Sequence, residues 1–283
     1  MLFTQLKSGL LSKWEPATGV RTIADCGGGP NGAAFGPDGR VYVCNNGGAE
    51  WEHLGGALYL PRVHEPSAPT GCIQVVEPAG GSLSVLYTEC DGRPLIAPND
   101  LVFDASGGFY FTDFGRVGER AILRGALYYA RIDGSRIERV VAGLDRPNGV
   151  GLSPDGGRVY VSETATGRIW WWEVRSEGRL SGGRTYRGSG GGNLLYAAPG
   201  ADRFDSLAIE EDGNVCVATY FDRGVTVVSP SGELVEVVEF PGDRLLTNLC
   251  FAGGGERTAF VTSPGLGVLY RCTWPRPGLR TIF

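Results

Sequence analysis

The stretch "RPNGVGLSPDGGRVYVSE", residues 146–163, contains two short apolar runs separated by a turn. Val, Leu and Tyr fill the runs, and the intervening "SPDGG" combines Pro, Asp and Gly, which is typical of a tight hairpin. Asn148 stands directly before the first run. A strand that is buried in a protein core does not require an amide side chain at this position. This polar position is understood once the rest of the chain is compared with it.

The same arrangement recurs along the chain. Each copy begins with a polar residue, continues with an apolar run, turns at a segment that contains Gly and ends with a second apolar run. Further strand-like pairs lie between the copies, so one period accommodates about four strands, as a blade of a β-propeller does. The five copies are "PNGAAFGPDGRVYVCNN" (30–46), "PNDLVFDASGGFYFTDF" (98–114), "PNGVGLSPDGGRVYVSET" (147–164), "FDSLAIEEDGNVCVATY" (204–220) and "TNLCFAGGGERTAFVTS" (247–263).

The N-terminal residues indicate a sixth blade. "MLFTQLKSG" (1–9) matches the second strand of a copy, and "LLSKWEPATG" (10–19) matches the strand that follows it. The polar position of this blade would then precede Met1. The sequence therefore predicts an all-β fold, a six-bladed β-propeller that forms a single domain over residues 1–283 and whose first blade is incomplete.

The composition excludes several classes of partner. Charged residues make up 20% of the chain, the net charge is −5, and Lys and Arg are not clustered, so we expect neither nucleic acid nor a membrane surface as a partner. No stretch approaches the run of about 20 apolar residues that crosses a bilayer. The first residues show no signal-peptide pattern, and the seven widely spaced cysteines lack a C-x-x-C pair. We therefore expect a cytoplasmic protein with reduced thiols.

The polar residues that open the copies form a candidate metal site. The innermost strand of each propeller blade lines the central channel, so residues about 50 positions apart in sequence converge at one mouth. Carboxylate and amide oxygens suit Ca²⁺ or Mg²⁺, whereas the two histidines of the chain do not favour a zinc site built from several His ligands. In the alternative interpretation each polar residue only stabilises its own turn. The set comprises Asn31, Asn99, Asn148, Asp205 and Asn248.

The converging set also supplies the catalytic candidate. Asp205 is its only carboxylate, so it is predicted to position or deprotonate the attacking water. A carboxylate bound to a cation is a poor base, so the role of metal ligand ranks first for Asp205. Asn99 and Asn148 are the other predicted ligands. The predicted substrate-binding residues are Asn31, Asn99, Asp100 and His53, the last of which lies in the insertion at 47–71.

Several motifs in fixed order resemble one family. "APND", "DASGGFYFTD", "RGALYYARIDG", "RPNGVGLSPDGGRVYVSE" and "FDSLAIEEDGNVCVATY" are similar to segments of the regucalcin (senescence marker protein) and gluconolactonase family, over almost the entire chain. Paraoxonases and diisopropylfluorophosphatases are more distant relatives. The resemblance implies a divalent cation, often Ca²⁺, at the channel mouth. By this resemblance Asn148 matches the principal Asn ligand of the family, Asp205 matches its Asp ligand, and Asn99 matches an additional Asn that binds the metal or the substrate.

One family ligand has no counterpart here. The family Glu stands in an "E-G-P" at the start of the first inner strand, a segment that would precede Met1, so we expect the chain to be truncated at its N-terminus. The predicted function is that of a metal-dependent lactonase that opens a small-molecule lactone or related ester with Ca²⁺, or with Mg²⁺, Mn²⁺ or Zn²⁺, in the central channel. The alternatives are a phosphotriesterase-like or strictosidine-synthase-like enzyme and a non-catalytic propeller that binds a ligand or a protein.

Overall fold

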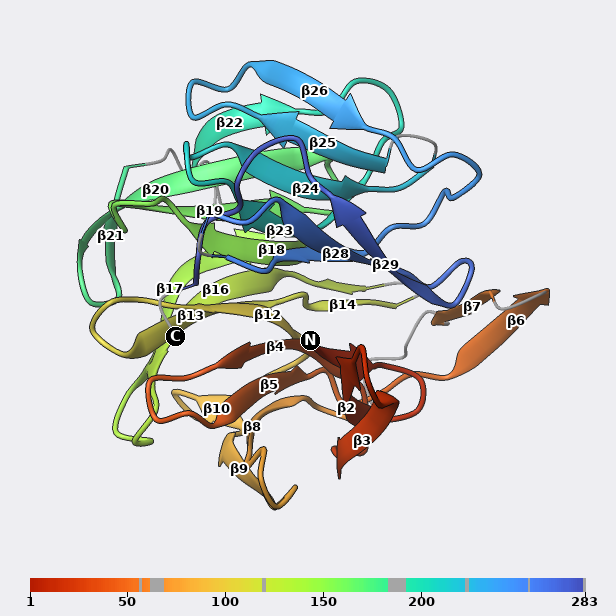
Figure 1. Cartoon of the computed structure of the whole chain (residues 1–283). Coiled ribbons are helices and arrows are strands. Elements are labelled where there is room, and N and C mark those ends of the chain that lie inside the picture. The colour runs from red at the N-terminus through yellow and green to blue at the C-terminus, as the bar shows by residue number, and fades with distance from the viewer. Residues whose placement is uncertain are drawn as a thin grey trace.

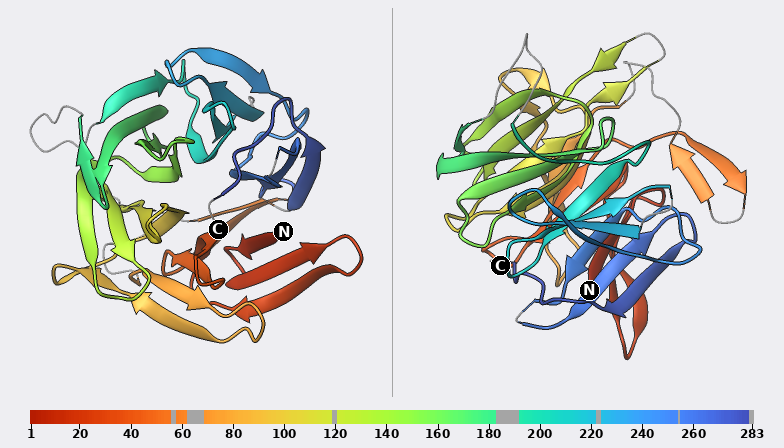
Figure 2. Two further views of the ribbon diagram at one scale, coloured as in Figure 1. Left: turned by 60° about the vertical axis from the view of Figure 1, so that its left-hand side comes forward. Right: turned by 90° about the horizontal axis from the view of Figure 1, so that it is seen from above.

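Six small antiparallel sheets surround a common axis in the computed structural model of the chain (Figures 1 and 2). The structure describes residues 1–55, 58–61, 69–118, 121–182, 192–221, 224–253 and 255–281. These residues form strands, turns and connections, and among them no helix is long and apolar enough to cross a membrane. The predicted all-β, six-bladed propeller is confirmed.

Each blade is one sheet whose strands follow one another outward from the axis, with a fifth strand paired to β20 in blade four. Blade one contains β1 (Leu2–Gln5), β2 (Leu10–Glu15) and β3 (Gly19–Asp25); blade two contains β4 (Pro30–Phe35), β5 (Val41–Asn45), β8 (Cys72–Val76) and β9 (Leu83–Tyr87); blade three contains β12 (Pro98–Phe103), β13 (Gly108–Asp113), β16 (Gly125–Arg131) and β17 (Ile137–Leu144). Blade four contains β18 (Pro147–Leu152), β19 (Arg158–Glu163), β20 (Arg168–Ser176), β21 (Arg179–Ser181) and β22 (Asn193–Ala197); blade five contains β23 (Phe204–Ile209), β24 (Val215–Thr219), β25 (Gly224–Val228) and β26 (Leu234–Val238); blade six contains β27 (Asn248–Phe251), β28 (Thr258–Ser263) and β29 (Val268–Thr273).

In the part of the chain that the structure describes, three two-stranded hairpins lie outside the blades. The hairpin of β6 (Trp51–Gly55) and β7 (Leu58–Pro61) projects from one face of the ring, as Figure 1 and the right view of Figure 2 show. The other two are β10 (Glu89–Cys90) with β11 (Arg93–Pro94), and β14 (Arg116–Val117) with β15 (Ile122–Leu123).

The hydrophobic core lies between neighbouring blades. Tyr42 of blade two packs against Phe103 and Phe109 of blade three, with ring centroids 5.2 and 5.7 Å apart. Similar clusters join the other consecutive pairs from blade one to blade six. The second strands of blades two to five are covered on both faces, so they read as nearly continuous apolar runs, and all six residues of β13 are buried.

Hydroxyl groups link the second strand of one blade to the first strand of the next. Thr112 of β13 donates to the backbone carbonyl of Asn148 at 2.5 Å, and Ser162 of β19 donates to that of Asp205 at 2.6 Å. Thr4 of β1 donates in the same way to the carbonyl of Asn31 at 2.5 Å. β1 therefore occupies the place of a second strand, as the sequence comparison predicts.

The Gly of the "PNG" motif allows neighbouring inner strands to approach closely. A Cβ atom on Gly149 would lie 2.4 Å from the backbone nitrogen of Leu207 in the next blade. A Cβ atom on Gly32 would lie 2.6 Å from Oδ1 of Asp100. Glycine is therefore required here by proximity, and it brings the polar residues that precede it together.

The C-terminal segment folds back against the far end of blade five. The Leu279 amide donates to the carbonyl of Ile209 at 2.9 Å. Nε of Arg276 and Nε1 of Trp274 donate to the buried carboxylate of Glu210 at 2.5 and 2.6 Å. These contacts attach the last residues to β23 at the end opposite Asp205.

Candidate active site

The five predicted polar residues occupy equivalent places at the start of the inner strands. Asn31, Asn99, Asn148 and Asp205 are the second residues of β4, β12, β18 and β23, and Asn248 is the first of β27. These five strands contact one another in this order. Asn99, Asn148 and Asp205 are more than nine-tenths buried, whereas Asn31 and Asn248 are partly exposed.

Asn148 is held by hydrogen bonds on both sides of its amide. Nδ2 donates to Oγ1 of Thr164 at 3.1 Å, and Thr164 in turn donates to the carbonyl of Phe204 at 2.7 Å. Oδ1 accepts a long hydrogen bond of 3.4 Å from Ser206. The nitrogen side is thus anchored, and among the described residues the oxygen side accepts this one long bond.

Asp205 lies beside Asn148 and carries the most perturbed carboxylate of the cluster. Its Oδ2 accepts a hydrogen bond from the hydroxyl of Tyr220. Burial, together with the negative charge of Asp100, raises the pKa of Asp205 to about 7 although Tyr220 and Asn148 hydrogen-bond to it. Among the described residues no Lys or Arg forms an ion pair with it, so its charge lacks compensation.

Asp100 is the second carboxylate of the cluster. It is 8% exposed, its Oδ1 accepts from the Leu101 amide at 2.9 Å, and its carboxylate also accepts from Ser206. Burial raises its pKa to about 6. The Ser206 hydroxyl can donate its one hydrogen to either Asp100 or Asn148, so it lies between side chains of blades three and four.

The donors fit a hard divalent cation. The described chain contains no group of three or more His, Cys, Asp and Glu side chains that could hold a metal, so any site here must rely on amides. Asn99 makes no side-chain hydrogen bond to the described residues although it is 7% exposed. A carboxylate without a counter-charge, beside amide oxygens, is a set that Ca²⁺ accepts.

Two predicted substrate-binding residues take no part in the hydrogen bonds described above. His53 is exposed on β6, in the hairpin that projects from the ring (Figure 1). Asn31 occupies the equivalent position of blade two, beside Gly32, which closely approaches Asp100, and its backbone carbonyl accepts the hydrogen bond from Thr4. The substrate contacts of both residues remain predictions.

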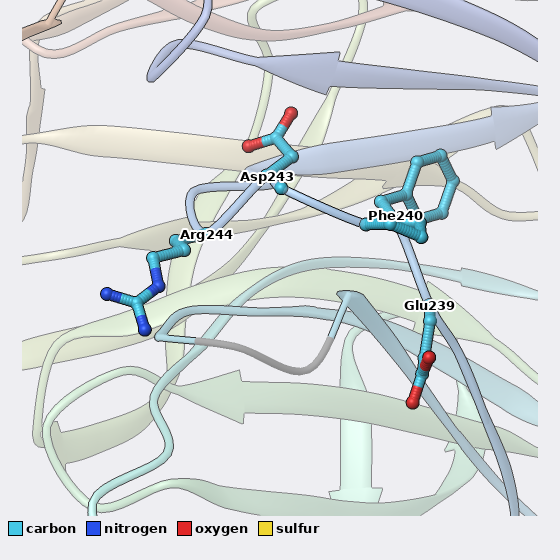
Figure 3. A pocket seen from close by; sticks show the side chains of 6 residues that line it. Glu239, Phe240, Asp243 and Arg244 are labelled. Atoms are coloured by element: carbon cyan, nitrogen blue, oxygen red, sulfur yellow. The ribbon is translucent and has the colours of Figure 1, made fainter.

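A shallow hollow lies on the connection between β26 and β27. Its volume is about 210 Å³, and Figure 3 shows four of its lining side chains, Glu239, Phe240, Asp243 and Arg244. The charged ends of Glu239 and Arg244 point in different directions in this view, so the hollow does not assemble a reactive group.

Three residues of the cluster were not found from the sequence, namely Thr164, Ser206 and Tyr220. Each hydrogen-bonds to Asn148 or Asp205. Thr164 and Tyr220 follow the ends of second strands, where the repeat shows no common residue type. Only the position of Ser206, directly after Asp205, could have indicated it.

Comparisons with known proteins agree with this architecture. Residues 1–265 match the family model described as "SMP-30/Gluconolactonase/LRE-like region". A gluconolactonase of Zymomonas mobilis is 27% identical over 288 aligned positions, which cover 93% of this chain and 72% of that protein. Lactonase drp35 of Staphylococcus saprophyticus is 30% identical over 205 positions, 72% of this chain; the alignment spans only 55% of that lactonase.

Solved structures share the fold at lower identity. A gluconolactonase of Xanthomonas campestris superposes with a TM-score of 0.72 at 23% identity, covering 97% of this chain and 82% of the other. A calcium-binding regucalcin of Agrobacterium tumefaciens superposes with a TM-score of 0.71 at 15% identity, covering 97% and 88%.

Proposed function

The chain belongs to the SMP-30/gluconolactonase/LRE-like family, and we propose that it is a lactone-hydrolysing enzyme that uses a divalent cation at the start of the inner strands. The family match and the gluconolactonase and lactonase relatives support the reaction class. The observation that carries the site is the buried carboxylate of Asp205, which lies beside Asn148 without a cationic partner among the described residues.

Asp205, Asn148 and Asn99 would hold the cation. Ca²⁺ is the first choice because it accepts neutral and anionic oxygens in irregular geometry, and the similar regucalcin structure is described as calcium-binding. When bound, the cation supplies Lewis acidity that polarises a lactone carbonyl and stabilises the developing negative charge. Asp205 acts as the anionic ligand, because a cation keeps its carboxylate ionised.

Asp205 is proposed to position the attacking water, and because a cation ligand is a poor base, Asp100 is proposed to accept the proton. Its carboxylate lies close enough to Asp205 for the two charges to interact, yet Ser206 and Leu101 hold it through separate hydrogen bonds. In the proposed reaction water adds to the lactone carbonyl and gives its proton to Asp100. The bond from the carbonyl carbon to the ring oxygen then breaks, and this oxygen takes up the proton, so a hydroxy acid leaves.

The substrate is a small-molecule lactone, and the six blades are proposed to act as one unit over residues 1–283. All seven cysteines are free and four of them are buried, which favours a reducing compartment such as the cytoplasm.

The test is a panel of sugar, aromatic and aliphatic lactones, with acid release followed by a pH indicator, in Ca²⁺ and in EDTA. We expect hydrolysis of at least one lactone that EDTA abolishes and Ca²⁺ restores. A phosphotriester in the same panel distinguishes the alternative chemistry. If no lactone is hydrolysed in any divalent cation, the proposed function is wrong.

A further inference from the structure

We propose that Tyr220 is a positioning residue for Asp205, which fixes one carboxylate oxygen so that the other is presented to the cation. The inference rests on the proposed function and extends it to a residue outside the ligand set. Tyr220 directly follows β24, and its hydroxyl donates to Oδ2 of Asp205. In the proposed arrangement the other carboxylate oxygen, Oδ1, faces the cation.

The backbone around Tyr220 is held from two sides. Its amide donates to the carbonyl of Arg203 at 2.9 Å, and Tyr220 forms an isolated antiparallel bridge with Leu245 of the β26–β27 connection. The backbone position of Tyr220 is therefore fixed, and its side chain extends from the end of β24 to Asp205 at the start of β23. Such preorganisation of a ligand through its hydrogen-bond partner is how neighbouring groups tune metal sites.

Phe221, the next residue, has an unusual backbone conformation. Phe221 has a φ of +68°, in the left-handed region that a bulky side chain rarely adopts. Its amide donates to the carbonyl of Arg244 at 2.9 Å, and its ring lies edge-on to that of Tyr220, with centroids 5.9 Å apart. Backbone strain of this kind persists where the surroundings impose it, and it concentrates at functional sites.

The chain offers a matched control pair. Tyr129 donates to Oδ2 of Asp104 at 2.9 Å, which is the same contact at the turn between β12 and β13. This turn lies at the end of β12 opposite Asn99. Tyr129→Phe thus deletes an equivalent hydroxyl from a Tyr–Asp pair that has no part in the candidate site.

The experiment is a Ca²⁺ titration of wild type, Tyr220→Phe and Tyr129→Phe by isothermal calorimetry, with lactone hydrolysis measured in parallel. Loss of a partner of a metal ligand typically weakens binding by about 10- to 100-fold, and we expect a loss in this range for Tyr220→Phe. The kcat should fall in Ca²⁺ at the wild-type saturating concentration and recover in part at higher Ca²⁺. Tyr129→Phe should match wild type in both.

The outcomes separate the two proposals. If wild type binds no divalent cation, the proposed metal site fails and this inference fails with it. If wild type binds Ca²⁺ and Tyr220→Phe binds it within about twofold of wild type, only the positioning role is wrong. If Tyr220→Phe does not fold, Phe221→Gly decides, because it removes the supporting ring and relaxes the backbone. An unchanged Ca²⁺ affinity in Phe221→Gly then overturns the inference.

Discussion

A buried carboxylate lies near each end of strand β23, and only one of the two, Glu210, is paired with a positive charge among the described residues. Asp205 at the start is 8% exposed, and burial raises its pKa to about 7. Glu210, just past the other end, is fully buried; burial opposes its ionisation, but hydrogen bonds from Arg276, Asn214 and Trp274 outweigh it and lower the pKa. At about 3.3 Å per residue the two lie roughly 16 Å apart.

The difference lies in the counter-charge, because strand and burial are shared. Glu210 receives a guanidinium from the chain itself, so its charge secures the C-terminal segment. Asp205 receives hydrogen bonds from the Tyr220 hydroxyl, the Asn148 side chain and the Ser206 backbone, but no cationic partner among the described residues. Its buried carboxylate is therefore stabilised by a proton or by a cation from solution. Glu210 therefore stabilises the folded protein. Burying the uncompensated charge of Asp205 destabilises it, and a bound cation can remove this penalty.

Arg276→Ala should produce the largest effect, a loss of about 3–5 kcal/mol in the free energy of unfolding, because it leaves Glu210 buried and unpaired. Urea unfolding at pH 7 measures it. The control is Arg175→Ala, which removes an exposed ion pair with Glu173 and should cost less than about 1 kcal/mol. Equal losses in the two variants would mean that Arg276 does not compensate Glu210.

Asp205→Asn should have the opposite effect to Arg276→Ala, with a large loss of activity and no loss of stability. We expect lactone hydrolysis to fall by about 100-fold or more, equivalent to about 2.7 kcal/mol of transition-state stabilisation, because the anionic ligand is lost. In EDTA the variant should unfold at no lower urea concentration than wild type, since a buried uncompensated charge is removed. Glu210→Gln, in contrast, should lower stability. A destabilised Asp205→Asn protein in EDTA would contradict the comparison.

The two carboxylates should also give opposite pH dependence. The folded-state pKa of Asp205 is raised, so without metal its stabilising contribution is complete at low pH and is lost as the pH rises from about 4 to about 7. The stability advantage of Asp205→Asn in EDTA should therefore grow by about 2 kcal/mol between pH 5 and 7. For Glu210 the pKa is lowered, so its contribution is present at neutral pH and is lost in acid.

Urea unfolding of wild type, Asp205→Asn and Glu210→Gln at several pH values in EDTA measures these slopes. The deficit of Glu210→Gln should be largest at neutral pH and should shrink below pH 4.5. Parallel curves for Asp205→Asn and wild type would show that Asp205 is not perturbed by burial.

Ser162→Ala should have the smallest effect. Its hydroxyl is fully buried and donates to the carbonyl of Asp205, and loss of one such bond costs about 1 kcal/mol. The Ca²⁺ affinity should change little, because the carboxylate keeps its partners. Ser231→Ala, on an exposed turn, is the control for unfolding. If Ser162→Ala also lost Ca²⁺ affinity, the carboxylate of Asp205 would depend on the hydrogen bond to its backbone carbonyl and not on its side-chain partners alone.

The repeat predicted the fold and the positions of the polar residues, but not their partners. A pattern that returns about every 50 residues reveals which position faces the axis, so Asn148 and Asp205 could be located together. It does not reveal contacts that each blade makes differently, such as the hydroxyl of Tyr220 on Asp205. Nor could it locate Arg276, which lies beyond the last copy and reaches Glu210 only because the C-terminal segment folds back. His53 belongs to an insertion, and the repeat does not constrain insertions.

The hydroxyl bridges between blades have a consequence for redesign. Because Thr4, Thr112 and Ser162 hold the backbone of Asn31, Asn148 and Asp205, each donor position is fixed independently of its side chain. The charge at the axis can therefore be changed one blade at a time. Substituting Asn31 with Asp would add an anionic donor without disturbing its bridge, and the same ring could be adapted to cations of higher charge, such as lanthanides.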